Sequence, residues 1–115
     1  MISQVPPETA TGWVTAMDVR DGTVRWKYHA DAPILANTTV TSTGLVFTGS
    51  LKGDFIVLDA NSGKELYRRA MDAGVGGGMV TYRLHGREYV AVETGGVSKF
   101  FGGTAPATFT VFALE

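Results

Sequence analysis

The amino-acid sequence predicts an all-β fold made of many short strands. Glycine contributes 15 of the 115 residues, and the glycines lie between short runs of β-branched and aromatic residues. Glycine is unfavourable inside helices and favourable in tight turns, so this spacing indicates strands joined by turns. No segment repeats apolar residues with a sustained helical period, and we therefore expect almost no helix.

A sequence repeat narrows this fold class. Residues 16–26 and 57–67 each carry an Asp-x-x-x-Gly motif that is followed by an aromatic residue, at an offset of 41 positions. The matched pairs are Asp18 with Asp59, Gly22 with Gly63, and Trp26 with Tyr67. A period near 40 residues is the length of one four-stranded propeller blade. The sequence thus predicts a partial β-propeller of about two and a half antiparallel blades.

Each repeat unit is expected to form two strands joined by a hairpin turn. Apolar residues precede the aspartate at 13–17 and 55–58, and polar and apolar residues alternate after the glycine at 23–28 and 64–69. Aspartate can accept a hydrogen bond from the backbone two residues on, and glycine takes the positive φ of the turn. The alternation predicts that 23–28 and 64–69 are half-exposed outer strands.

Further strands are expected between and after the two units. Residues 37–41 and 45–49 flank a turn at 42–44, and the apolar run 45–49 is typical of a strand buried on both faces. The remaining strands are expected at 78–83, 88–93 and 108–114. The sequence thus predicts groups of two, four and three strands. We expect residues 12–115 to form one domain and residues 1–11, with two consecutive prolines, to form a flexible arm.

Composition excludes several classes of function. The net charge is −1 and no basic stripe is present, which argues against a nucleic-acid partner. There is no cysteine, so disulfides and thiolate metal sites are excluded. No apolar run approaches the roughly 20 residues that span a bilayer. The first eight residues lack the basic and apolar regions of a signal peptide, which predicts a cytoplasmic location for the chain as written.

The ordered motifs resemble those of a known family. Gly12 to Asp18, followed by Gly22 and Trp26, is similar to the tryptophan-docking repeat of quinoprotein dehydrogenases. The penultimate blade of that family resembles residues 45–49, 53–55 and 59–64, and its final segment resembles residues 76–78, 89–92 and 101–103. Over residues 12–114 the chain therefore resembles the C-terminal segment of pyrroloquinoline-quinone (PQQ)-dependent alcohol dehydrogenases.

The resemblance implies a setting in which eight blades surround a channel that holds PQQ and calcium. Calcium then acts as a Lewis acid on a quinone carbonyl while a carboxylate takes the proton of the alcohol. The resemblance also implies a periplasmic location. The family's calcium ligands, catalytic aspartate and vicinal cysteine pair lie in earlier blades and have no counterpart here. We therefore assign no catalytic or metal-binding residue, and expect that this chain alone binds neither PQQ nor calcium.

Two segments are candidates for contact with a cofactor. The glycine-rich run 74–78 lacks the Lys-Ser/Thr of a phosphate-binding loop, and a strand rather than a helix is expected after it. It is either a flexible connection between blades or a stretch of backbone at the propeller axis, where Gly76 and Gly77 let a flat cofactor approach. Phe100 and Phe101 lie in a long loop, where they either wall the channel mouth, as in the family, or fill a blade interface.

The remaining polar residues have structural interpretations. Asp18 and Asp59 are expected to form turns rather than to bind metal, because no bidentate glutamate follows at the spacing of a calcium loop. His29 and His85 have no partner at a spacing suited to a metal site and are expected at the surface.

Three functional hypotheses remain open at this stage. The chain is a quinoprotein dehydrogenase fragment that is inactive alone, or a non-catalytic assembly or binding module, or one part of an enzyme built from several chains. Too few blades to close a ring leave strand edges and apolar faces exposed. We therefore expect a homo-oligomer, or a partner chain that supplies the missing blades.

Overall fold

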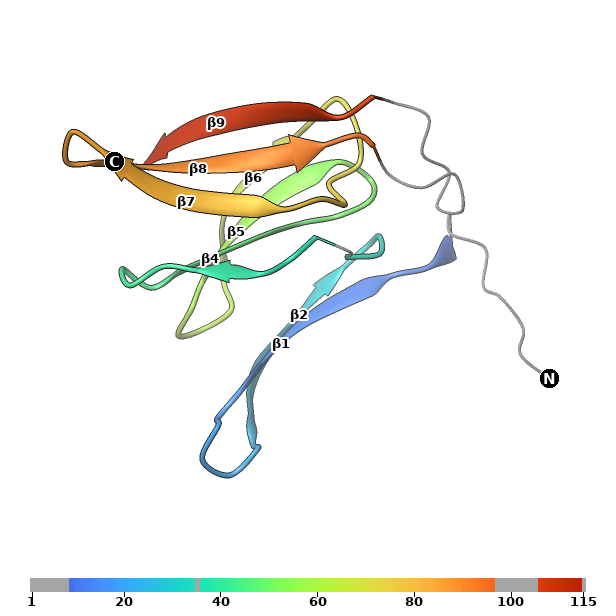
Figure 1. The fold of residues 1–115 in the computed structure, drawn as a ribbon. Helices are drawn as coiled ribbons and strands as arrows, with labels where there is room; N and C mark the ends of the chain where they lie inside the picture. The colour runs from blue at the N-terminus through green and yellow to red at the C-terminus, as the bar shows by residue number, and fades with distance from the viewer. Residues whose placement is uncertain (1–8, 35, 97–105, 115) are drawn as a thin grey trace.

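The computed structural model describes residues 9–34, 36–96 and 106–114, which form three antiparallel sheets (Figure 1). In chain order the strands are β1 (Gly12–Met17) and β2 (Val24–Ala30) in the first sheet; β3 (Thr39–Val40), β4 (Leu45–Gly49), β5 (Asp54–Asp59) and β6 (Glu65–Ala70) in the second; and β7 (Met79–Leu84), β8 (Arg87–Thr94) and β9 (Thr108–Leu114) in the third. The predicted all-β fold and its grouping of strands are confirmed. The described residues contain no helix that is long and apolar enough to cross a membrane.

Each sheet is a meander in which strands that are neighbours in the sequence are also hydrogen-bonded neighbours. The two repeat units share a further detail of geometry. The pairing of β1 with β2 shifts register between Ala16 and Met17, and the pairing of β5 with β6 shifts between Val57 and Leu58. These irregularities lie at equivalent positions of the repeat, so both hairpins bend and twist at the same point.

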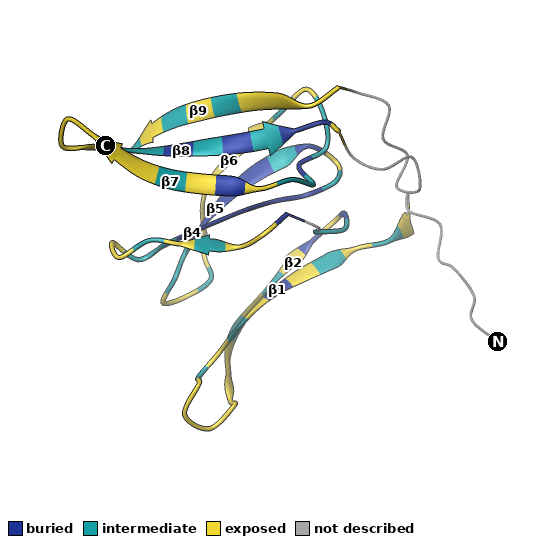
Figure 2. Ribbon diagram, viewed as in Figure 1, coloured by how far each residue is buried: buried dark blue, intermediate teal, exposed yellow. Residues whose placement is uncertain are grey.

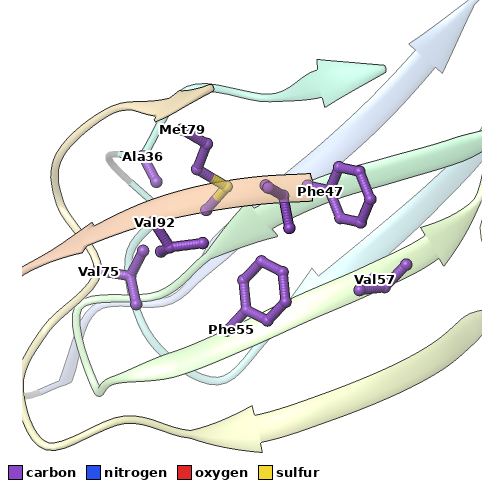
Figure 3. Close-up of a cluster of buried hydrophobic side chains, with 8 residues drawn as sticks. Ala36, Phe47, Phe55, Val57, Val75, Met79 and Val92 are labelled. Atoms are coloured by element: carbon purple, nitrogen blue, oxygen red, sulfur yellow. The ribbon is translucent and has the colours of Figure 1, made fainter. Parts of the chain in front are cut away.

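The second sheet lies between the other two, and its central strands are buried on both faces (Figures 1 and 2). One face packs against the first sheet in a cluster of four buried residues, Val14, Val46, Ile56 and Leu58. The other face packs against the third sheet in a cluster of eight, Ala36, Phe47, Phe55, Val57, Val75, Met79, Val90 and Val92 (Figure 3). Full burial of each large apolar side chain stabilises the fold by about 1.5–3 kcal/mol. The prediction that 45–49 is buried on both faces is thus confirmed.

One buried polar group interrupts the face toward the first sheet. The side chain of Thr48 is fully buried, and its hydroxyl has no hydrogen-bond partner among the described residues. Thr48 alternates with Phe47 along β4 and therefore shares the face of Val46. An unsatisfied buried hydroxyl is costly, so this position weakens the packing around it.

The prediction that residues 64–69 form a half-exposed strand is wrong in its burial pattern. All six residues of β6 are exposed, although the strand itself forms where expected. Among the described strands β6 pairs with β5 alone and forms the outer edge of the second sheet, where single contacts such as Arg68 with Tyr28 and Tyr67 with Phe55 leave both faces exposed. Charged residues on such an edge oppose pairing with a further strand. Most of the expected arm 1–11 lies outside the described residues, so its flexibility stays a prediction.

Candidate functional site

The two repeat turns have the same geometry. The backbone N–H of Gly22 donates to the Asp18 carbonyl oxygen at 2.8 Å, and Gly63 donates to Asp59 at 2.8 Å. Gly22 and Gly63 have φ values of 75° and 74°. Each aspartate also accepts a hydrogen bond from the backbone two residues on, at 2.9 Å for Asp18 and 2.8 Å for Asp59. Both aspartates are thus placed as turn-forming residues.

The Asp18 turn carries one additional interaction. The Arg20 guanidinium pairs with the Asp18 carboxylate at 2.8 Å. Hydrogen bonds from the side chain and backbone of Arg20 lower the pKa of Asp18 to about 2. The carboxylate is therefore held in its charged form by its own turn.

Trp26 connects the first repeat to the second. Its indole lies directly over Gly63, because a Cβ added to Gly63 would be 2.5 Å from the Trp26 ring. The indole Nε1–H also donates to the Ala60 carbonyl at 2.8 Å. The aromatic residue of one unit thus docks on the glycine turn of the next. By contrast, a Cβ added to Gly22 would meet nothing within 4 Å.

Tyr67, at the position equivalent to Trp26, lies between the second and third sheets. Its side chain is 47% exposed and meets the Phe55 ring edge-on, with centroids 6.4 Å apart. Phe55 in turn stacks on Phe112 of β9 at 4.7 Å. The junction between the second and third sheets is therefore built from stacked phenylalanines, and Tyr67 remains nearly half exposed.

A hydrogen-bonded network also joins the first two sheets. The Tyr28 hydroxyl donates to Glu65 at 2.6 Å, and Arg68 donates to Tyr28, Glu65 and Asp54 at 2.7–3.0 Å. Hydrogen bonds from Tyr28 and Arg68 lower the pKa of Glu65. Burial, together with the hydrogen bond to Glu65, raises the pKa of Tyr28. The network fixes the orientation of β2 against β6 and leaves no free base.

The glycine-rich run forms the connection between β6 and β7, from the second sheet to the third. It is held on both sides: Val75 N–H donates to Ser50 at 2.9 Å, and Gly95 N–H donates to the Gly74 carbonyl at 2.9 Å. Gly77 lies against Glu93, since an added Cβ would be 2.6 Å from a carboxylate oxygen. Gly76 and Gly77 are partly exposed. Their expected contact with a cofactor stays a prediction.

The loops at this end of the sheets surround a small hollow. It has a volume of about 200 Å³ and lies between the segment after β6 and the start of β9, with Asp72, Thr94 and Thr108 among its lining residues. Asn37 connects the second sheet to the third nearby, accepting a hydrogen bond from Met79 N–H at 2.9 Å.

The described residues do not supply a calcium site. Calcium binds six to eight oxygen ligands, usually with several carboxylates. Within 9–34, 36–96 and 106–114, no group of three or more His, Asp or Glu side chains could hold a metal ion. These residues therefore do not fit the calcium that accompanies PQQ.

The remaining candidate residues are two phenylalanines and two histidines. Phe100 and Phe101 lie outside the described residues, so their predicted role stays open. His29 stacks on Trp13 at the outer face of the first sheet, with centroids 4.2 Å apart. His85 lies in the turn between β7 and β8 with φ of 52°. Both histidines lie at the surface, as expected.

Sequence reasoning missed the polar contacts between sheets. The Tyr28–Arg68 pair joins β2 of the first sheet to β6 of the second, and Asn37, which precedes β3, accepts a hydrogen bond from the first residue of β7. Their sequence signal is weak, because Tyr28 and Arg68 lie 40 residues apart and only a three-dimensional blade packing brings them together. The repeat of about 40 residues is the one sequence feature that indicates that Tyr28 and Arg68 are neighbours.

Successive antiparallel meanders that dock through an aromatic on a glycine turn define a portion of a β-propeller. The comparison with known families agrees: the family PQQ_2, described as outer membrane protein assembly factor BamB, matches residues 10–104. The chain belongs to this family of PQQ-type propellers, and its relatives are quinoprotein alcohol dehydrogenases.

Two relatives illustrate the match. The dehydrogenase subunit of a quinone alcohol dehydrogenase from Gluconacetobacter polyoxogenes is 36% identical over 97 residues, which covers 82% of this chain and 13% of the relative. A quinoprotein ethanol dehydrogenase from Pseudomonas aeruginosa is 35% identical over 95 residues, covering 83% and 14%. The chain thus spans only a small part of the length of these relatives.

Solved structures agree on the fold. The quinohemoprotein alcohol dehydrogenase from Comamonas testosteroni superposes with a TM-score of 0.77 over 90% of this chain and 16% of its own, at 24% identity. A europium-containing methanol dehydrogenase gives a TM-score of 0.68 over 72% of this chain and 15% of its own, at 30% identity. The three sheets therefore have the arrangement of blades in these enzymes.

Proposed function

We propose that this chain supplies structural blades of a PQQ-dependent alcohol dehydrogenase propeller and does not catalyse alcohol oxidation by itself. The observation that carries the proposal is the docking of Trp26 on Gly63 in a chain related to quinoprotein alcohol dehydrogenases. This contact connects one blade to the next and involves no reactive group. The proposal includes a periplasmic location, by resemblance to that family.

The chemistry of the described residues supports a structural role. Oxidation of an alcohol by a quinone needs a Lewis acid on the quinone and a base for the hydroxyl proton. Glu65 is occupied by Tyr28 and Arg68, and Asp18 by Arg20. Their pKa values are lowered, which makes both carboxylates weak bases. Other segments of a larger propeller would have to provide the reacting groups.

A segment exchange tests the proposal directly. Residues 12–114 would replace the matching segment of the Pseudomonas aeruginosa quinoprotein ethanol dehydrogenase. If the segment supplies blades only, the chimera should fold, bind PQQ and calcium, and oxidise ethanol within about tenfold of the parent rate. The chain alone, with PQQ and calcium added, should give no turnover in the same dye-linked assay. A folded chimera without PQQ binding, or turnover by the chain alone, would contradict the proposal.

A second candidate is an assembly module that completes a propeller with copies of itself or with a partner chain. The outer face of the third sheet favours it, because Val80, Ala91 and Val111 form one cross-strand row that no described residue covers. Nearby Phe109 is 69% exposed. An apolar sheet face of this kind is typical of an interaction surface.

Sedimentation velocity separates the two candidates. An assembly module should be oligomeric at micromolar concentration, and Val111→Lys should dissociate it by placing a charge in the apolar row. Val19→Lys is the matched control, since Val19 is 99% exposed in the Asp18 turn and away from that face. A monomeric wild-type chain, or equal effects of the two variants, would exclude assembly through the third sheet.

A further inference from the structure

An apolar cavity lies between the second and third sheets, at the end that carries the repeat turns. It has a volume of about 310 Å³, and its walls include Phe47, Phe55, Val57, Tyr67 and Phe112. The walls come from β4, β5, β6 and β9, so the cavity belongs to the interface between two sheets. It lies at the opposite end of the sheets from the glycine-rich connection and takes no part in the proposed function.

The first interface of the chain shows what fills the equivalent region. There the indole of Trp26 occupies the space over the Gly63 turn, with its N–H bonded to Ala60. The second interface has Tyr67 at the repeat-equivalent position, with one ring instead of two. Tyr67 meets Phe55 only edge-on, at 68° between ring planes, and remains 47% exposed. The cavity is therefore bordered by the residue that replaces tryptophan in the repeat.

The shape and chemistry of the walls specify a class of ligand. Phe55 lies nearly parallel to Phe112, at 10°, and to Phe47, at 13°, so the three rings form one aromatic stack along the cavity. No lining side chain carries a charge. The Arg69 guanidinium lies over the Phe112 ring at 5.6 Å and disfavours a second cation nearby. A flat, uncharged aromatic molecule suits these walls.

Volume sets the size of that molecule. An apolar cavity of about 150 Å³ accepts one benzene ring. Twice that volume accommodates a fused two-ring system, and it reaches the lower end of the usual range for small-molecule sites, about 300 Å³. We propose that this cavity binds a neutral, planar two-ring aromatic compound, and that free indole, the group used at the first interface, is its simplest probe.

Methyl NMR on the full chain tests the proposal without any substitution. Indole should shift the methyl resonances of Val57 and Leu114 with one saturable binding curve and give intermolecular NOEs to them, since both residues line the cavity. Exposed Val80 and Val111, on the outer face of the third sheet, should not respond. Saturable shifts confined to Val80 and Val111, or no shift up to the solubility limit of indole, would overturn the proposal.

Two matched variants provide an independent test. Tyr67→Trp should fill the cavity and weaken indole binding at least tenfold. Tyr82→Trp adds the same side chain on the outer face of the third sheet, where Tyr82 stacks on Tyr89, and should change affinity less than twofold. Equal indole affinity in the Tyr67→Trp variant and the wild-type chain would place the ligand elsewhere and refute the assignment.

Discussion

Replacing Gly63 by alanine should destabilise the chain much more than the same change at Gly22. The two glycines occupy equivalent turns and share nearly the same φ, 74° and 75°. The two glycines differ in which atoms an added Cβ would contact. An alanine Cβ at position 63 would be 2.5 Å from the Trp26 ring, whereas at position 22 it would meet nothing within 4 Å. Gly22→Ala is therefore a control for the backbone cost alone.

The expected magnitudes follow from these two contributions. An L-residue in the left-handed region costs about 1–2 kcal/mol, and this cost applies to both variants. Displacement of Trp26 also breaks its hydrogen bond to Ala60, worth about 1 kcal/mol. Part of the indole burial is lost as well; complete truncation of a buried tryptophan costs about 3–5 kcal/mol. Because Trp26 is only partly buried, we expect a total near 4 kcal/mol for Gly63→Ala, built from these contributions.

Urea unfolding followed by far-UV circular dichroism measures these free energies. A double-mutant cycle with Trp26→Leu identifies the cause. If the clash with the indole is responsible, Gly63→Ala should cost only the backbone term in the Trp26→Leu background, with a coupling of about 2 kcal/mol. Equal destabilisation by Gly22→Ala and Gly63→Ala, or a cost at Gly63 that is independent of Trp26, would refute the docking argument.

Three further predictions concern polar groups. Thr48→Val should raise the free energy of unfolding by about 1 kcal/mol, measured by urea titration, because it removes a buried hydroxyl without a partner among the described residues. The pKa of Asp18 is lowered from 3.8 to about 2, so its stabilising contribution should be complete only well above pH 3.8 and be lost as the pH falls through about 2. Arg20→Gln should raise the Asp18 midpoint in a carboxyl NMR titration; an unchanged midpoint would exclude the ion pair. Tyr28→Phe should raise the pKa of Glu65, since it removes the main hydrogen bond that lowers that pKa, and an unaltered Glu65 titration would contradict the network.

Local patterns were sufficient to predict the strands and their grouping. The Asp-x-x-x-Gly motif predicts where a hairpin turns, because aspartate and glycine satisfy that turn with their own chemistry. The 41-residue offset between Trp26 and Tyr67 then predicts blades rather than a barrel or sandwich. Burial on both faces of 45–49 follows from a continuous apolar run, which needs a covering sheet on each side.

Contacts between sheets were beyond the reach of these patterns. The strand β6 forms where expected, yet all six of its residues, Glu-Leu-Tyr-Arg-Arg-Ala, are exposed, because the exposure of an edge strand depends on how far the neighbouring sheets extend. The hydrogen bond between Asn37 and Met79 depends on how one blade is rotated against the next. Phe100 and Phe101 lie outside the described residues, and contact of Gly76 and Gly77 with a cofactor stays a prediction.

The arrangement of the strands determines how a destabilising substitution in one sheet affects the other sheets. Among the described strands, every backbone ladder lies within one sheet, so the three sheets contact each other through side chains and through a few hydrogen bonds of the connecting segments, such as Val75 N–H to the Ser50 carbonyl. The stability of the chain is then approximately the sum of the stability of each sheet and the interactions between neighbouring sheets. β4 and β5 take part in both interfaces, because one of their faces packs against the first sheet and the other against the third. A destabilising substitution in these two central strands therefore disturbs both interfaces between the described sheets.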